Sequence, residues 1–132
     1  MPIRIYDSFA VLKFFQKERG YQKVAKLLEE DHKGDSSPLI QIVNFGEIIY
    51  RTKKDFGNDA KLRVIRSVVQ LGFRIISASD NLVYAAAELK GSYPISYADA
   101  FLLATALREN AVIITGDPEF KKVEFLCSVD WG

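Results

Sequence analysis

Short apolar runs alternate along the chain with longer segments in which apolar residues recur every three to four positions. Short runs of this kind are typical of buried strands, and the longer repeats are typical of amphipathic helices. The predicted strands are Arg4–Tyr6, Leu39–Val43, Phe73–Ser77, Ala111–Thr115 and Phe125–Val129. The predicted helices are Phe9–Lys17, Tyr21–His32, a helix from Asn44 to about Lys54, Ala60–Leu71, Leu82–Lys90, Ala98–Arg108 and Glu119–Val123. This alternation indicates an α/β fold with a mainly parallel sheet covered on both faces.

Polar residues mark where these elements begin and end. Ser8 follows the first strand and is expected to cap the next helix, and Asn44 is expected to cap the helix that runs to about Lys54. Ser96 stands three residues before Asp99, which is the spacing of a capping box. The pattern contains no linker, internal repeat or low-complexity segment, so residues 1–132 are expected to form a single domain.

Four acidic residues stand at the edges of apolar segments, where a carboxylate is costly unless it is paired, hydrogen-bonded or bound to a metal. Asp7 and Asp117 follow predicted strands. Glu47 and Asp99 lie in the first turns of predicted helices. Ligands of open α/β sheets bind beyond the carboxyl ends of the strands, so the four side chains are expected to converge there.

Clustered carboxylates cannot all stay charged without a counter-cation. Oxygen ligands favour a hard divalent cation, Mg²⁺ or Mn²⁺, and the sequence has no Cys/His cluster that would suggest zinc. Such a metal can polarise a phosphodiester and activate water, so the pattern indicates phosphodiester hydrolysis.

Each acid also has a simpler explanation when it is taken alone. Asp99 is explained as a capping-box residue, Asp117 as a turn former before Pro118, and Glu47 as an exposed helix residue. Asp7 is the hardest to explain in this way, because a strand end followed directly by a helix is a functional position. The hypothesis therefore rests on the four acids as a set.

The bulk composition narrows the choice of function only slightly. The 132 residues are 48% hydrophobic, with 18 Lys+Arg against 17 Asp+Glu and a net charge of +1, so RNA binding would have to rest on local patches. The single cysteine, Cys127, excludes an intramolecular disulfide framework and is consistent with a reducing cytoplasm. No apolar run reaches the roughly 18 residues of a membrane span, so no membrane association is expected.

With these residues in place, the chain resembles a PIN domain, most closely the single-domain VapC-type ribonuclease toxins and their archaeal relatives. The resemblance spans essentially the whole chain, and it rests on the order of four motifs more than on any one of them. The motifs are Asp7-Ser8, Asn44-Phe45-Gly46-Glu47, Ser96-Tyr97-Ala98-Asp99-Ala100 and Thr115-Gly116-Asp117-Pro118-Glu119-Phe120.

The resemblance implies a PIN-like three-layer α/β/α fold with a mainly parallel central sheet of four to five strands. It also implies an endoribonuclease that depends on Mg²⁺ or Mn²⁺, is commonly dimeric and, in toxin members, is inhibited by a small antitoxin. The resemblance further implies that Asp7, Glu47, Asp99 and Asp117 bind the metal and carry the catalysis.

Further positions match the family's motifs less directly. Ser8 and Thr115 match supporting polar positions that could hydrogen-bond the acids or a water. Glu119 matches a less regular extra acid, which is expected at most to support the metal ligands from outside, and a solvated side chain is the simpler interpretation. Where this chain has Gly116, family members often carry Arg, so one candidate phosphate contact is missing.

Possible RNA contacts lie next to the acids. RNA phosphates could contact two groups of basic residues. These are Arg51, Lys53 and Lys54, and Lys121 and Lys122. The simpler interpretation of both groups is that they are solvated side chains on the surface. Tyr97 could stack a base, and so could Tyr6 and Tyr50, although these two are expected to be buried in the core. His32 is expected to take no part.

Other classes of protein explain the sequence less well. A haloacid dehalogenase-type phosphotransferase needs a second Asp two residues after the first, where this chain has Phe9. A response-regulator receiver needs paired acids near the first strand and a lysine after a late strand, and neither is present. A degenerate PIN-like module that binds RNA or a partner without cleaving stays open as the alternative.

Overall fold

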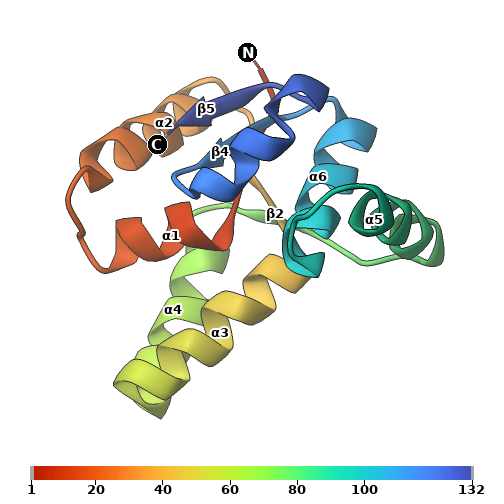
Figure 1. Ribbon diagram of the computed structural model, residues 1–132. Helices are drawn as coiled ribbons and strands as arrows, with labels where there is room; N and C mark the ends of the chain where they lie inside the picture. The colour runs from red at the N-terminus through yellow and green to blue at the C-terminus, as the bar shows by residue number, and fades with distance from the viewer. Residues whose placement is uncertain (1, 132) are drawn as a thin grey trace.

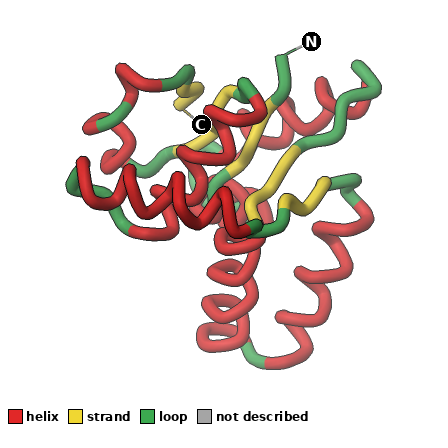
Figure 2. The backbone as a smooth tube through the Cα atoms, turned by 90° about the vertical axis from the view of Figure 1, so that its right-hand side faces the viewer, coloured by secondary structure: helices red, strands yellow, loops and turns green. Residues whose placement is uncertain are grey.

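The computed structural model describes residues 2–131, which form five strands, six α-helices and two short 3₁₀ helices (Figures 1 and 2). The strands are β1 (Arg4–Tyr6), β2 (Leu39–Gln41), β3 (Arg74–Ile76), β4 (Val112–Thr115) and β5 (Val129–Trp131). The helices are α1 (Ser8–Phe15), α2 (Tyr21–Lys33), α3 (Ile42–Phe56), α4 (Asn58–Gln70), α5 (Asp80–Ser92), α6 (Tyr97–Glu109), and the 3₁₀ helices η1 (Pro118–Lys122) and η2 (Glu124–Leu126). None of these helices is long and apolar enough to cross a membrane.

The five strands form one parallel sheet in the order β3-β2-β1-β4-β5, which confirms the predicted α/β fold. β1 lies in the middle and pairs with β4 over its whole length, with Ile5 opposite Ile113. Because both strands run in the same direction, their carboxyl ends meet at one edge of the sheet.

Alternate residues of the strands face two separate cores. Ile5 and Ile113 pack with α5 and α6, whereas Tyr6 and Ile114 pack with α1 to α4 on the opposite face. The sheet is thus the middle layer of an α/β/α sandwich, as predicted. On the second face, α3 and α4 form a hairpin that extends away from the sheet (Figures 1 and 2).

Most predicted boundaries are displaced by one or two residues, and two predicted helix caps are wrong. Asp7, not Ser8, caps α1, because the Asp7 side chain accepts a hydrogen bond from the Ala10 backbone. Gln41, not Asn44, caps α3 by accepting from the Val43 N–H, so the second strand is two residues shorter than predicted. The Asn44 side chain instead donates to the Ala98 carbonyl at 3.3 Å and links α3 to α6.

The last strand is also displaced from its predicted position. Residues 124–126 form η2, and β5 begins only at Val129. The prediction of a strand over Phe125–Val129 relied on apolar residues, but Phe125 is 71% exposed.

Candidate metal centre

The site begins where β1 and β4 end. Asp7 directly follows β1, and its N–H donates to the Ile114 carbonyl of β4 at 3.1 Å. Asp117 lies two residues beyond β4, in the turn that starts η1. The pairing of the two strands therefore places both acids at the same edge of the sheet.

Thr115 connects these two acids. Its hydroxyl donates to Asp7 Oδ2 and accepts from the Asp117 N–H, with 3.0 Å between the Asp117 nitrogen and Thr115 Oγ1. The other Asp7 oxygen, Oδ1, accepts from the Ala10 N–H at 2.7 Å. Both oxygens of the buried Asp7 carboxyl are thus held by neutral donors, and the position of the Asp117 backbone is fixed relative to them.

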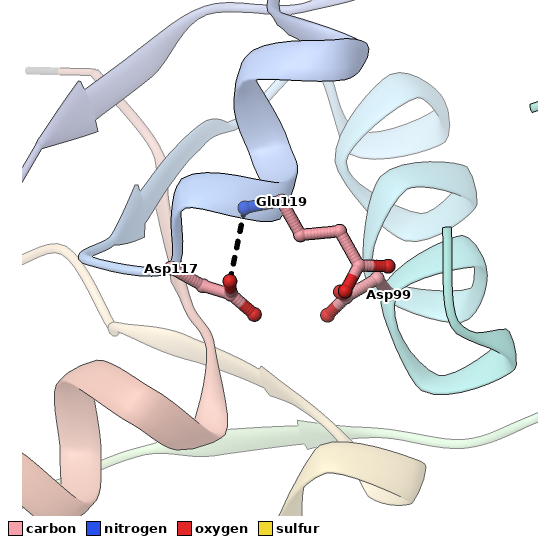
Figure 3. A group of neighbouring side chains, drawn as sticks. All are labelled: Asp99, Asp117 and Glu119. Carbon is pink, nitrogen blue, oxygen red and sulfur yellow. Dashed lines mark hydrogen bonds between the residues drawn. The ribbon is translucent and has the colours of Figure 1, made fainter. Parts of the chain in front are cut away.

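Asp99 reaches the same place from the other side of the sheet. It lies in the first turn of α6, where Ser96 caps the helix by accepting the Asp99 N–H at 3.1 Å. Asp99, Asp117 and Glu119 each offer a carboxylate oxygen, and these oxygens lie within 4.8 Å of one another. Figure 3 shows the three carboxylates facing a common space between η1 and α6.

Glu47 lies at the border of this group. It belongs to α3, and its Oε1 accepts a hydrogen bond from the Ser8 hydroxyl at 3.2 Å. The Arg51 guanidinium is 4.0 Å from its Oε2. Neither Glu47 nor Asp7 belongs to the tight group in Figure 3, yet the negative charges of Glu47 and Asp117 both raise the pKa of Asp7, so all three acids belong to one electrostatic neighbourhood.

Crowding and burial make two of the carboxylates difficult to ionise. Burial raises the pKa of Asp7 to about 7 despite hydrogen bonds from Thr115 and Ala10 that lower it. Burial, followed by the charges of Glu119 and Asp117, raises the pKa of Asp99 to about 7. A cation placed among these oxygens would stabilise the ionised form of both carboxyls.

The donor set is suited to Mg²⁺ or Mn²⁺. All the candidate ligand atoms are carboxylate oxygens, which hard divalent cations prefer, and within residues 2–131 the tight group contains no His or Cys. Asp99, Asp117 and Glu119 could hold such an ion, and Asp7 and Glu47 lie in the same electrostatic neighbourhood. The site can therefore accommodate the metal that the sequence predicted.

One residue of the group was underestimated. The sequence favoured a solvated role for Glu119, but its Oε1 accepts the Ser96 N–H at 2.5 Å, and its own N–H donates to Asp117 Oδ1 at 3.0 Å. Its match to the family's less regular extra acid, two residues after Asp117, was the sign of this role in the sequence. A second expectation was wrong as well, since Tyr50 is 56% exposed, whereas Tyr6 is fully buried as predicted.

The remaining candidates lie on the surface around the site. Tyr97 is 45% exposed at the start of α6. Lys122 donates to the Pro94 carbonyl at 3.2 Å and so connects η1 to the loop before α6. His32 is exposed near the end of α2 and lines a hollow with residues 35–38, away from the acids.

Known structures share this fold. VapBC2 from Rickettsia felis, bound to a DNA fragment from its promoter, matches with a TM-score of 0.74 at 17% identity over 97% of each chain. A toxin-antitoxin complex from Klebsiella pneumoniae matches with a TM-score of 0.72 at 19% identity, over 96% of this chain and 95% of that one. VapC20 from Mycobacterium tuberculosis, a Sarcin-Ricin loop cleaving toxin, matches with a TM-score of 0.66 at 13% identity, over 83% of this chain and 86% of that one.

Curated protein sequences give no match to this chain. A family model gives a clear one, because the model of the PIN domain matches residues 5–126, which is nearly the whole chain. The chain therefore belongs to the PIN domain family.

Proposed function

We propose that this protein is an endoribonuclease that requires Mg²⁺ or Mn²⁺ and acts as the toxin of a VapBC-type pair. The observation that carries the proposal is the gathering of Asp99, Asp117 and Glu119 within 4.8 Å, beside the buried Asp7, at the carboxyl edge of a PIN fold. An RNA substrate and a single cysteine are consistent with a cytoplasmic protein.

The proposed roles of the acids, metal binding and orientation of the attacking water, follow from the contacts that each side chain makes. A bound Mg²⁺ or Mn²⁺ would polarise the scissile phosphodiester and make an attacking water more acidic. Asp7, Asp99 and Asp117 would supply the oxygens that hold the ion. Glu47 is oriented by the Ser8 hydroxyl and is placed to orient the attacking water or to take part in a second ion site. Hydrolysis would leave a 5′-phosphate and a 3′-hydroxyl.

RNA would approach over exposed cationic and aromatic side chains near the acids. Arg51 lies one turn after Glu47 and is exposed. Lys121 is exposed on η1, and Tyr97 is exposed at the start of α6. Phosphate contacts of this kind give binding that weakens as salt rises.

The proposed function includes protein partners. Solved structures with this fold include toxin-antitoxin complexes, which supports a small antitoxin as the inhibitor of this chain. We also expect the chain to form a homodimer. Co-purification with the product of the adjacent gene tests for the antitoxin, and light scattering tests for the homodimer. A chain that is monomeric, and whose activity the neighbouring product does not inhibit, would contradict this part of the proposal.

RNA cleavage with Mn²⁺ is the decisive test. The wild type should cleave single-stranded RNA, and EDTA should stop it. Asp7→Asn should lower the rate by at least about 100-fold, because a buried charged oxygen beside the ion is lost while the shape of the side chain is kept. Asp59→Asn is the matched control, since Asp59 is an exposed acid in the first turn of α4 and should be dispensable.

Two results would contradict the nuclease proposal. One is undiminished cleavage by Asp7→Asn. The other is a wild type that binds RNA but takes up no Mn²⁺ in a calorimetric titration, which would favour the non-catalytic binding module instead.

A further inference from the structure

The capping box at the start of α6 is shared between two segments of the chain. In an ordinary capping box the cap hydroxyl accepts the N–H of the third helical residue, and the acid at that third position accepts the cap's own N–H. The first half is present here, because Ser96 Oγ accepts the Asp99 N–H at 3.1 Å. The second half comes from η1, where Glu119 Oε1 accepts the Ser96 N–H at 2.5 Å.

Because Glu119 takes the Ser96 N–H, the Asp99 carboxylate does not make the return bond of the box, and its contact with Ser96 is to the side chain alone, which by itself lowers the pKa of Asp99. Asp99 occupies the position whose side chain would ordinarily turn back to the Ser96 N–H. With that N–H bound to Glu119, the Asp99 carboxylate faces Asp117 instead (Figure 3). The acid that accepts the N–H of the cap residue is therefore Glu119, and Asp99 is left to face Asp117.

A continuous series of hydrogen bonds results. Asp117 Oδ1 accepts the Glu119 N–H at 3.0 Å, and Glu119 Oε1 in turn accepts the Ser96 N–H. Ser96 Oγ then accepts the N–H of Asp99. The backbone positions of Asp117, at the start of η1, and Asp99, in the first turn of α6, are thus connected through Glu119.

A second contact holds the same two segments together. Lys122 Nζ donates to the Pro94 carbonyl at 3.2 Å, one residue before Ile95 and two before Ser96. This contact fixes η1 to the loop but touches none of the carboxylates. Glu119 is therefore the member of the pair that can influence the metal centre.

We propose that Glu119 is a positioning residue, which completes the cap of α6 from η1 and so keeps the Asp99 carboxylate free to bind the metal. The proposal rests on the proposed function, because it assigns Asp99 to a divalent cation. It differs from a ligand role for Glu119 in a testable way. Positioning needs a hydrogen-bond acceptor on the side chain, whereas direct binding to Mg²⁺ or Mn²⁺ needs its negative charge.

The test compares two substitutions at this position in the full-length chain. Glu119→Ala removes the acceptor, so the Asp99 carboxylate can turn back to the Ser96 N–H, and Mn²⁺ affinity measured by electron paramagnetic resonance should fall about tenfold or more. Glu119→Gln keeps an acceptor oxygen, so the affinity should stay within about threefold of the wild type. Glu124→Ala, an exposed acid of η2, is the matched control and should leave the affinity unchanged.

A metal-free readout follows the cap itself. The amide proton resonance of Ser96 should keep its downfield position in Glu119→Gln and move upfield in Glu119→Ala. Equal affinities for the wild type and Glu119→Ala would overturn the proposal, and so would a loss in Glu119→Gln as large as in Glu119→Ala. If Glu119→Ala does not fold, the affinity and the Ser96 resonance of Glu119→Gln decide the matter alone. A wild type that binds no Mn²⁺ would instead refute the proposed function.

Discussion

At the scale of single residues, the buried Asp7 side chain combines two tasks that conflict. It caps α1 through the Ala10 N–H, and it faces the other acids at the end of β1. Hydrogen bonds from Ala10 and Thr115 favour the ionised form, but burial outweighs them and leaves the pKa near 7. Neutral donors alone therefore leave the carboxyl half-protonated near neutral pH, and a bound cation would complete its ionisation.

The positions of individual acids were predictable to different degrees. Asp7 and Asp117 follow apolar strands, so the rule for parallel sheets was enough to place them at one edge. The contact between Glu119 and Ser96 was not predictable, because it joins residues 23 positions apart through two irregular segments. The spacing of apolar and polar residues in the sequence does not indicate which backbone N–H a side chain in an irregular segment will bind.

At the scale of secondary-structure elements, a polar contact fixes α2 against β1. Arg4 Nη1 lies 2.8 Å from Asp31 Oδ1, and the Tyr6 hydroxyl donates to Asp31 Oδ2 at 2.6 Å. Asp31 is fully buried, and burial together with the hydrogen bond to Asp31 raises the pKa of Tyr6 well above its usual value. The cluster of Arg4, Tyr6 and Asp31 fixes the position of β1, the strand that ends at Asp7, and so helps to fix the position of Asp7 itself.

Asp31→Ala should therefore destabilise the protein. The substitution removes the acceptor that the Arg4 guanidinium and the buried Tyr6 hydroxyl share. Arg4 keeps Glu30 at 3.4 Å, so the main cost is the unsatisfied Tyr6 hydroxyl, about 1 to 3 kcal/mol. Urea denaturation measures the free energy of unfolding. Glu29→Ala is the control on the same helix, because the Glu29–Lys33 pair is exposed and its loss should leave stability nearly unchanged. Equal stabilities for the two variants would contradict the anchoring role.

The elements themselves were predictable where the burial pattern is strong. β4 is buried between both helical layers and is apolar up to Thr115, and β1 has the buried pair Ile5 and Tyr6 after Arg4, so both strands were predicted. The end of β2 was misplaced because Ile42 and Val43 are apolar, and such residues continue a strand pattern as well as they start a helix. β5 was misplaced because it is an edge strand of half-buried residues, which leaves no clear apolar pattern in the sequence.

At the scale of the whole molecule, the candidate metal centre joins the two helical layers. Asp7 and Glu47 belong to the side formed by α1 and α3, whereas Asp99 belongs to α6 on the opposite face. A cation shared among these acids would hold both layers to the edge of the sheet. A ligand that binds only the folded state raises its stability, so the metal should stabilise the entire domain.

The same acids make the stability of the metal-free protein depend on pH. Asp7 and Asp99 have folded-state pKa values of about 7, above the value near 4 that is usual for the unfolded chain. Between these values the folded state binds more protons than the unfolded state, so the contribution of each acid to stability falls as pH rises from about 4 to about 7. The slope for one group is at most about 1.4 kcal/mol per pH unit.

The contribution of Asp7 is isolated by comparing wild type and Asp7→Asn without metal across this range. The stability of the variant relative to the wild type should increase steadily from pH 4 to pH 7 and then level off, because only the wild type must ionise a buried carboxyl. Excess Mn²⁺ should reverse the trend in the wild type and raise its melting temperature more at pH 8 than at pH 5.5, since protons no longer compete for the ligand oxygens. Thermal unfolding in matched buffers measures both effects. Parallel curves for the two proteins would show that Asp7 ionises in the folded state as easily as in the unfolded chain, and the electrostatic basis of the site would then be lost.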